Sequence, residues 1–300
     1  MRILFISANR VGDAILTTGL LDHLIRQHPQ CRITVACGPA AEGVFVRMPN
    51  LERLIVFAKR SLRSHWLGLW RQVAFTFWDL VVDMRGSALS FLVPARRRVV
   101  TRSLSGRKHE QFARLLGISP APLPVAWTGP QDRARAAGLV PAGRPVVALG
   151  PTANWAPKAW PADRFAALFH ALRDGPLPGA VPLILAGPGP EEAALAAPLA
   201  ALLPGSIDLT GRLSLPEAAA CLQRAALYVG NDSGLMHLAA AAGTPTVGLC
   251  GATMATAAEY EPAGPLARWA MASGPRMEDL AVVTALEAVL DVLARVKMPA

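Results

Sequence analysis

Residues 227–253 read LYVGNDSGLMHLAAAAGTPTVGLCGAT, and this stretch decides the fold class. It begins with a short apolar run of strand type, Leu227–Val229, and ends with a second such run, Thr246–Leu249. Between them lie a polar turn flanked by glycines and a segment of helix-forming residues, Leu235–Ala242. The stretch therefore predicts a strand–turn–helix–turn–strand unit, the repeating element of a parallel sheet covered by helices.

Asp232 and Ser233 stand at the start of the predicted helix. The first turn of a helix leaves N–H groups unpaired at the positive end of the helix dipole, and a phosphate or diphosphate fits that position. Asp232 is equally well explained as the N-cap of the helix. The stretch on its own leaves both interpretations open, the binding site and the simple cap.

The composition is that of a globular protein with a basic excess. The chain has 300 residues, enough for two domains of ordinary size, and 52% of them are hydrophobic. Lys and Arg number 30 against 21 Asp and Glu, a formal net charge of +9, which favours nucleic acid, an anionic lipid surface or phosphorylated substrates as partners. We expect no structural zinc site and scattered small thiols in a reducing cytoplasm, because the cysteines are not clustered: Cys31, Cys37, Cys221 and Cys250.

The longest uncharged stretch worth questioning is 233–258. Gly243, Pro245 and two further glycines interrupt it, and its apolar pattern changes from helical to strand-like. We interpret it as the interior of an α/β domain and not as a membrane span. No secretory signal is visible before the first strand, so we expect a protein without a membrane span whose basic face touches a membrane.

Strand-type and helix-type segments alternate in two series. Strands are expected at 2–7, 32–37, 53–57, 80–83 and 99–100, and then at 146–149, 183–186, 207–209, 227–229 and 246–249. This pattern predicts an α/β fold of two doubly wound, Rossmann-like domains that face each other across a cleft, with ligands at the carboxyl ends of the strands.

The domain boundaries follow from composition. We expect domains at 1–125 and 146–281, separated by a linker rich in Pro, Gly and Ala at 126–145. Residues 282–300 are expected to supply a C-terminal amphipathic helix that packs back on the first domain. Ser214 and Glu217 have the spacing of a capping box at the start of another helix.

Five motifs occur in a characteristic order: GDAILTT at 12–18, WAPKAWP at 155–161, AGPGPEE at 186–192, GRLSLPE at 211–217 and GNDSGLMHLA at 230–239. Together they resemble glycosyltransferase family 9, the heptosyltransferases of lipopolysaccharide core synthesis, over nearly the whole chain. The resemblance implies a GT-B fold, inversion at the anomeric carbon and ADP-heptose as the usual donor. It also implies that the first domain binds the acceptor and the second binds the nucleotide sugar.

The resemblance implies two catalytic residues. Asp13 matches the family's general base, which deprotonates the attacking acceptor hydroxyl. Lys158 is a point charge suited to the departing diphosphate. The alternatives are that Asp13 caps the helix that follows it and that Lys158 is an ordinary surface lysine.

The resemblance also implies a set of donor-binding residues: Thr152, Lys158, Glu192, Leu213, Asp232, Ser233, Gly234 and His237. Hydroxyls and backbone N–H groups would meet the diphosphate, and His237 shares a helix face with Ser233 by its i, i+4 spacing. Glu192, or its neighbour Glu191, would hold the ribose, and Leu213 would pack on adenine. A packed core histidine, an acidic first helical turn and simple packing are the corresponding alternatives.

The acceptor side is basic, with Arg60, Arg63, Arg102 and Lys108 as the expected acceptor-binding residues. They suit an anionic glycolipid such as Kdo-bearing lipid A or a phosphorylated core. We expect no metal and no cofactor besides the ADP-sugar substrate, because no acidic pair of DxD type lies near a strand end in the second domain. The expected protein is a monomer, cytoplasmic and peripheral on the cytoplasmic face of the inner membrane.

Other functions remain open at this point. One is a GT-B transferase or epimerase-like enzyme that uses another nucleotide sugar or another cell-surface glycan. Another is a non-catalytic protein that binds nucleotide sugars or glycolipids. Nucleic acid is disfavoured as a partner, because no RNA-binding aromatic motif, KH loop or basic recognition helix is present.

Overall fold

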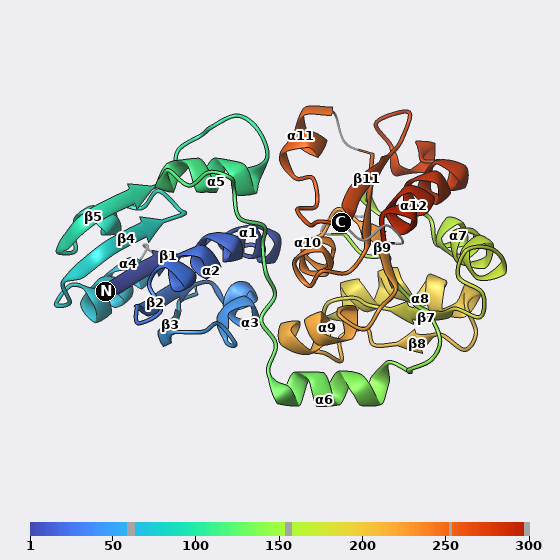
Figure 1. The fold of residues 1–300 in the computed structure, drawn as a ribbon, viewed down its shortest axis with the longest axis horizontal. Helices are drawn as coiled ribbons and strands as arrows, with labels where there is room; N and C mark the ends of the chain where they lie inside the picture. The colour runs from blue at the N-terminus through green and yellow to red at the C-terminus, as the bar shows by residue number, and fades with distance from the viewer. Residues whose placement is uncertain (59–63, 154–157, 252–253, 297–300) are drawn as a thin grey trace. The chain divides into compact units, whose positions relative to one another are not determined.

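The computed structural model describes residues 1–58, 64–153, 158–251 and 254–296. Contacts within the chain divide it into two compact units, Met1–Trp127 and Thr128–Ala300. Each unit is built on a sheet of its own with helices around it (Figure 1).

The sheet of the first unit has the strand order β3-β2-β1-β4-β5, and every neighbouring pair in it is parallel. Its strands are β1 (Arg2–Ile6), β2 (Arg32–Cys37), β3 (Leu51–Val56), β4 (Trp78–Asp83) and β5 (Ala95–Val100). The central strand β1 is almost completely buried after its first residue, since helices cover both faces of a doubly wound sheet. The order reverses between β1 and β4, which is the topological switch point.

The helices of the first unit are α1 (Val11–Leu16), α2 (Thr18–Gln27), α3 (Glu42–Phe45), α4 (Ser64–Val73) and α5 (Lys108–Leu116). Leucines and isoleucines recur at helical spacing through this part of the sequence, yet the structure divides it into two helices at Thr17. The hydroxyls of Thr17 and Thr18 donate hydrogen bonds to the carbonyls of Ala14 and Ile15, and each bond is 2.7 Å long. Such bonds back to the preceding turn bend a helix, and here α1 ends where they occur.

The second unit repeats the same winding with one more strand. Its order is β11-β10-β9-β6-β7-β8, again all parallel. The strands are β6 (Val146–Gly150), β7 (Val181–Ile184), β8 (Ile207–Asp208), β9 (Leu227–Asn231), β10 (Thr246–Cys250) and β11 (Ala267–Met271). The switch point lies between β6 and β9. Two doubly wound, Rossmann-like α/β sheets are thus confirmed.

The helices of the second unit are α6 (Pro130–Leu139), α7 (Ala162–Asp174), α8 (Pro190–Leu202), α9 (Leu215–Leu222), α10 (Gly234–Ala241), α11 (Met254–Glu259) and α12 (Val282–Val296). The predicted capping box at α9 is confirmed: Ser214 Oγ accepts from the Glu217 N–H, and Glu217 Oε2 accepts from the Ser214 N–H over 2.8 Å. The uncharged stretch 233–258 forms α10, β10 and most of α11. None of the helices in the described ranges is both long and apolar enough to cross a membrane.

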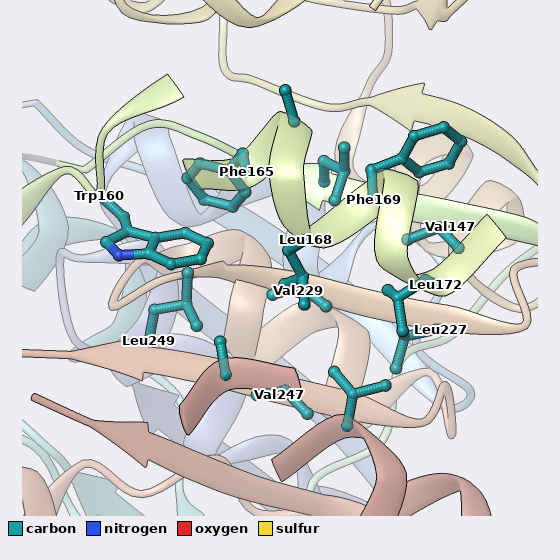
Figure 2. Packing of buried hydrophobic residues seen from close by; sticks show 14 of the residues in the cluster. Val147, Trp160, Phe165, Leu168, Phe169, Leu172, Leu227, Val229, Val247 and Leu249 are labelled. Carbon is teal, nitrogen blue, oxygen red and sulfur yellow. The ribbon is translucent and has the colours of Figure 1, made fainter. Parts of the chain in front are cut away.

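The core of the second unit lies between α7 and the sheet. Figure 2 shows Phe165, Leu168 and Leu172 of α7 packed over Val229 of β9 and neighbouring strand residues. Trp160 closes one end of this core with its ring 5.0 Å from that of Phe165. Burying large apolar side chains in this way is the main source of stability for the unit.

Two expectations about the chain's organisation differ from the structure. The expected linker contains α6, which packs against α9 within the second unit. The C-terminal helix α12 was expected to pack on the first domain, but it packs against β10, β11 and α7. The reason is its apolar stripe, since Ala285, Val289 and Val292 are buried in the same core as α7.

Candidate active site

The switch point of the second sheet brings two loops side by side. Gly150 ends β6 and pairs in register with Gly230 of β9. Thr152 follows β6 and is 2% exposed, and Asp232 and Ser233 follow β9. Four predicted donor-site residues therefore lie at one place, because Gly234 begins α10 directly after Ser233. Doubly wound sheets bind their ligands at such a point.

A buried carboxamide fixes these two loops to each other. Asn231, the last residue of β9, is completely buried. Its Oδ1 accepts from the backbone N–H of Trp160 over 3.0 Å, and its Nδ2 donates to the carbonyl of Pro151 over 2.8 Å. The indole N–H of Trp160 in turn donates to the carbonyl of Leu280 over 3.0 Å. Asn231 was not singled out from the sequence, although it lies inside the most specific motif.

Lys158 is held over the same switch point. Its Nζ lies 3.0 Å from Oδ2 of Asp232, so an ion pair joins the loop before α7 to the turn before α10. Both side chains are partly exposed, at 34% and 21%. The ammonium group is therefore positioned by the protein and still reachable from solvent.

The start of α10 offers hydrogen-bond donors. Ser233 is the N-cap residue, but its side chain makes no capping bond. Its Oγ is buried and has no hydrogen-bond partner among the described residues. The first-turn N–H groups of a helix point outward from this end, and His237 lies one turn further on, 5% exposed. Asp232 precedes the N-cap position, so its simple explanation as the cap does not apply.

A tyrosine fills the space behind this turn. Tyr228 of β9 is completely buried, and its hydroxyl lies so close to Gly150 and Gly230 that a Cβ at either glycine would be 2.1 or 2.3 Å from it. Burial raises the pKa of Tyr228. Two glycines at the switch point are thus required by the tyrosine between them.

Glu192 and Leu213 lie beside the next two strands, β7 and β8. Glu192 Oε2 accepts from the backbone N–H of Gly187 over 2.9 Å, which stabilises the turn before α8. The N–H of Gly211 donates to the carbonyl of Ala186 over 3.1 Å, so the turn carrying the half-buried Leu213 lies next to the Glu192 turn. Both turns share the carboxyl edge of the sheet with the switch-point loops.

In the first unit, Asp13 is in the first turn of α1 and half-buried. The N-cap position of this helix is Arg10, without a side-chain capping bond. The alternative that Asp13 is the N-cap is therefore wrong. Since β1 and β4 form the switch point of this sheet, α1, which follows β1, begins at the place equivalent to the loop after β6 in the second unit.

The predicted acceptor residues are only partly described. Arg102 is exposed two residues after β5, and Lys108 is the first residue of α5. Arg60 and Arg63 lie outside the described residues. Among the residues that the structure describes, no group of three or more His, Cys, Asp or Glu is placed to hold a metal ion.

A carboxylate at the end of β4 was missed from the sequence. Asp83 is completely buried. It accepts hydrogen bonds of 2.8 Å from the N–H groups of Arg85 and Ser87 and one of 2.6 Å from Ser87 Oγ. It stabilises the turn on the other side of the first switch point. A lone Asp after an apolar run carries no signal that would distinguish this role from others.

The family model and the relatives found by sequence agree on one family. The family model for glycosyltransferase family 9 (heptosyltransferase) matches residues 83–290. Lipopolysaccharide heptosyltransferase 3 of Escherichia coli is 31% identical over 281 residues, which cover 81% of this chain and 81% of that one. Both matches extend over most of the chain.

Two solved structures show the fold. The family 9 glycosyltransferase of Veillonella parvula has a TM-score of 0.82 at 19% identity and covers 98% of this chain and 97% of its own. ADP-heptose lipopolysaccharide heptosyltransferase II of Escherichia coli has a TM-score of 0.77 at 21% identity, with 99% and 100% covered. The predicted GT-B fold class is confirmed, and the chain belongs to glycosyltransferase family 9, the heptosyltransferases.

Proposed function

We propose that this glycosyltransferase is an inverting enzyme that moves a heptosyl unit from ADP-heptose to an anionic acceptor of the lipopolysaccharide inner core. One observation carries the proposal. Lys158, the buried Ser233 hydroxyl without a partner among the described residues and the first turn of α10 converge at the second switch point. A charge, a hydroxyl and N–H donors together suit a departing diphosphate.

The proposed chemistry is a single displacement. The acceptor hydroxyl transfers its proton to the Asp13 carboxylate as its oxygen forms a bond to the anomeric carbon. The bond from that carbon to the diphosphate oxygen breaks, and ADP leaves with the electron pair. Attack from the side opposite the leaving group inverts the anomeric centre without a covalent intermediate on the protein.

The remaining donor contacts are proposed from position. Thr152 and His237 are proposed to flank the diphosphate of the donor, and Leu213 is proposed to contact the adenine ring. Oε2 of Glu192 already accepts from Gly187, so Oε1 is the oxygen proposed to meet the ribose. ADP-heptose is proposed as the donor because it is part of the name of heptosyltransferase II of Escherichia coli, one of the two solved structures described above. No metal is assigned to the reaction.

We place the enzyme on the cytoplasmic face of the inner membrane as a peripheral protein and a monomer. The net charge of +9 supports contact with anionic lipid and with an anionic acceptor. Arg102 and Lys108 are the described residues proposed for the acceptor, together with Arg60 and Arg63 in the part of the chain that is not described. Sedimentation with anionic vesicles at low and high salt tests the membrane contact, which should weaken as salt rises.

The test of the reaction is ADP release from ADP-heptose, with and without deacylated inner-core saccharide and without added metal. Wild type is expected to release ADP only with acceptor, and Asp13→Asn should lower kcat by about 10²–10⁴-fold. Asp22→Asn is the matched control, because it removes the same charge from a partly exposed surface pair on α2. Binding of ADP-heptose to Asp13→Asn, with an unchanged unfolding midpoint, separates lost chemistry from lost folding.

Three results would contradict the proposal. Acceptor-independent ADP release would make the protein a hydrolase. Turnover in Asp13→Asn equal to that in Asp22→Asn would remove Asp13 as the base. Binding of a UDP-, GDP- or TDP-sugar without any binding of ADP-heptose would overturn the donor.

A further inference from the structure

The first unit contains a cavity that none of the roles above uses. It has a volume of about 280 Å³ and is lined by Asn9, Gly38, Pro39, Ala40, Phe57, His65 and Arg85. These residues follow β1, β2, β3 and β4, so the cavity opens at the carboxyl edge of the first sheet, beside its switch point. Its volume is near the lower end of small-ligand pockets, about 300–1,000 Å³, which suits one sugar unit.

The charged group of this cavity is Arg85. Its guanidinium carbon lies 5.0 Å from the ring centroid of Phe57 and 4.8 Å from that of Trp66. The two rings are themselves 5.5 Å apart, so the guanidinium rests on a pair of aromatic faces. The described residues place no carboxylate within ion-pair distance of it.

The backbone below Arg85 is fixed independently of its side chain. Asp83, completely buried, accepts from the Arg85 N–H and from two groups of Ser87. Burial lowers the pKa of Arg85 and the nearby Asp83 carboxylate opposes this, and an arginine stays charged in either case. The Arg85 guanidinium is thus half-buried at a turn that hydrogen bonds hold in place. The nearby Asp83 carboxylate already accepts from the backbone and from Ser87.

We infer that this cavity binds one anionic sugar of the acceptor, with Arg85 gripping its oxyanion and Phe57 contacting its ring. The inference rests on the proposed function for the identity of the ligand as an acceptor. A guanidinium offers two parallel N–H donors to a carboxylate or a phosphate. The aromatic wall suits the apolar face of a sugar ring, and Asn9, whose Oδ1 would be 3.1 Å from a Cβ at Gly38, supplies a polar group at the same wall.

The test is a binding measurement that needs no turnover. The probes are D-glucuronate for a carboxylate, glucose 6-phosphate for a phosphate and glucose as the neutral sugar. Binding is followed by tryptophan fluorescence, since Trp66 lies against Arg85, and Trp66→Phe identifies the part of the signal that comes from this ring. Wild type should respond saturably to at least one anionic sugar and not to glucose, and the responding probe identifies the oxyanion as carboxylate or phosphate.

Arg85→Gln should weaken that binding by about tenfold to a hundredfold, and Arg85→Lys by less, since it keeps the charge and loses the fork. Arg96→Gln is the matched control, because Arg96 is exposed on β5 and away from the cavity lining, and it should bind like wild type. Thermal unfolding shows that the variants are folded.

With turnover established, Arg85→Gln should raise KM for the acceptor far more than KM for the donor. Sugar binding through Arg85 in a protein without transferase activity would support the pocket and overturn only the proposed reaction. No saturable response to either anionic sugar, or equal weakening by Arg85→Gln and Arg96→Gln, would overturn the pocket.

Discussion

Lys158 Nζ lies 3.0 Å from Asp232 Oδ2, and this contact connects two loops that are 74 residues apart in the chain. The loops follow β6 and β9, the two strands at the switch point of the second sheet. Because both side chains are partly exposed, water screens the attraction between them and the pair adds little to stability. What the ion pair does is fix the position of the Lys158 ammonium group.

The first prediction separates these two effects. Lys158→Gln should change the free energy of unfolding by no more than about 1 kcal/mol. It should lower kcat for ADP release by about 10²–10³-fold, since the departing diphosphate loses the cation proposed to stabilise its charge. Urea unfolding and acceptor-dependent ADP release measure the two quantities. Arg173→Gln breaks an exposed pair of the same kind on α7 and should leave turnover unchanged; equal losses in both variants would refute the role of Lys158.

The second prediction concerns the tyrosine behind the switch point. Gly230→Ala places a Cβ 2.3 Å from the Tyr228 hydroxyl and 2.6 Å from its Cζ, and Gly150→Ala places one 2.1 Å from the hydroxyl and 2.9 Å from Cζ. Each should destabilise the protein by about 1–3 kcal/mol or more, because the buried ring has no space to move.

Adding Tyr228→Phe removes the hydroxyl and should restore more stability to Gly150→Ala than to Gly230→Ala, because the Cβ of the latter lies closer to Cζ, at 2.6 Å against 2.9 Å. Gly138→Ala is the control: nothing lies within 4 Å of its Cβ position on α6, so it should stabilise by up to about 1 kcal/mol. Urea unfolding of the single and double variants gives these differences. Equal rescue of both glycine variants would mean that the backbone, and not the tyrosine hydroxyl, absorbs the clash.

The third prediction is that the thiols of the native protein are inert. All four cysteines are free and buried. Burial, with a smaller contribution from Glu42, raises the pKa of Cys37 to about 12, and burial likewise raises the pKa of Cys221 to about 11. At pH 8 the thiolate fraction of Cys37 is then on the order of 10⁻⁴. Ellman's reagent should react with all four only after denaturation, and a fast-reacting thiol in the native protein would reveal local opening.

The fourth prediction concerns stability in acid. Burial at the start of α5 lowers the pKa of His109, with Glu110 opposing the shift and Arg107 adding to it. The unfolded chain binds this proton near pH 6.5 and the native protein only at lower pH. His109 therefore leaves stability unchanged well above pH 6.5, and it destabilises the native state increasingly as pH drops through 6.5 toward the native pKa.

His109→Gln should accordingly flatten the loss of stability between pH 7.5 and 5, as urea unfolding at several pH values will show. His28→Gln is the control for removing an imidazole from the surface, because His28 is exposed. A pH dependence in His109→Gln as steep as in wild type would assign the acid sensitivity to other groups.

The sequence was sufficient for the elements that bury continuous apolar runs. The strand at 32–37 has the predicted bounds, and the C-terminal helix begins at the predicted residue 282, because β-branched runs and amphipathic periodicity are local properties. The edge strand β11 was missed: Arg268 interrupts ARWAM, and a half-buried edge strand needs no apolar run. Helix α6 was missed because its sequence is rich in Ala, Arg and Gly without a clear apolar stripe, and its start is fixed by the Gly129–Asp132 contact.

The sequence motifs were sufficient to select single residues of the candidate site. They did not predict the contacts that arise only when distant segments meet in the fold. Asp232 and Lys158 were both singled out, yet their ion pair depends on β6 and β9 being neighbours in the sheet. Asn231 bonds to Pro151 and to Trp160, far along the chain, and Arg85 depends on Trp66 and Phe57 arriving from separate elements. Long-range pairings of this kind have no local sequence signal.

The hydrogen bond from the Trp160 indole to the Leu280 carbonyl sets an order of events during synthesis. Arg164 adds bonds to the same carbonyl and to that of Glu278. The loop that carries Lys158 is thus anchored on residues that the ribosome adds more than a hundred positions later. A nascent chain can complete the first unit early, since domains fold as they emerge. The second unit stays unfinished until residue 280 has left the exit tunnel, so a prematurely terminated chain lacks the bonds that anchor the loop of Lys158.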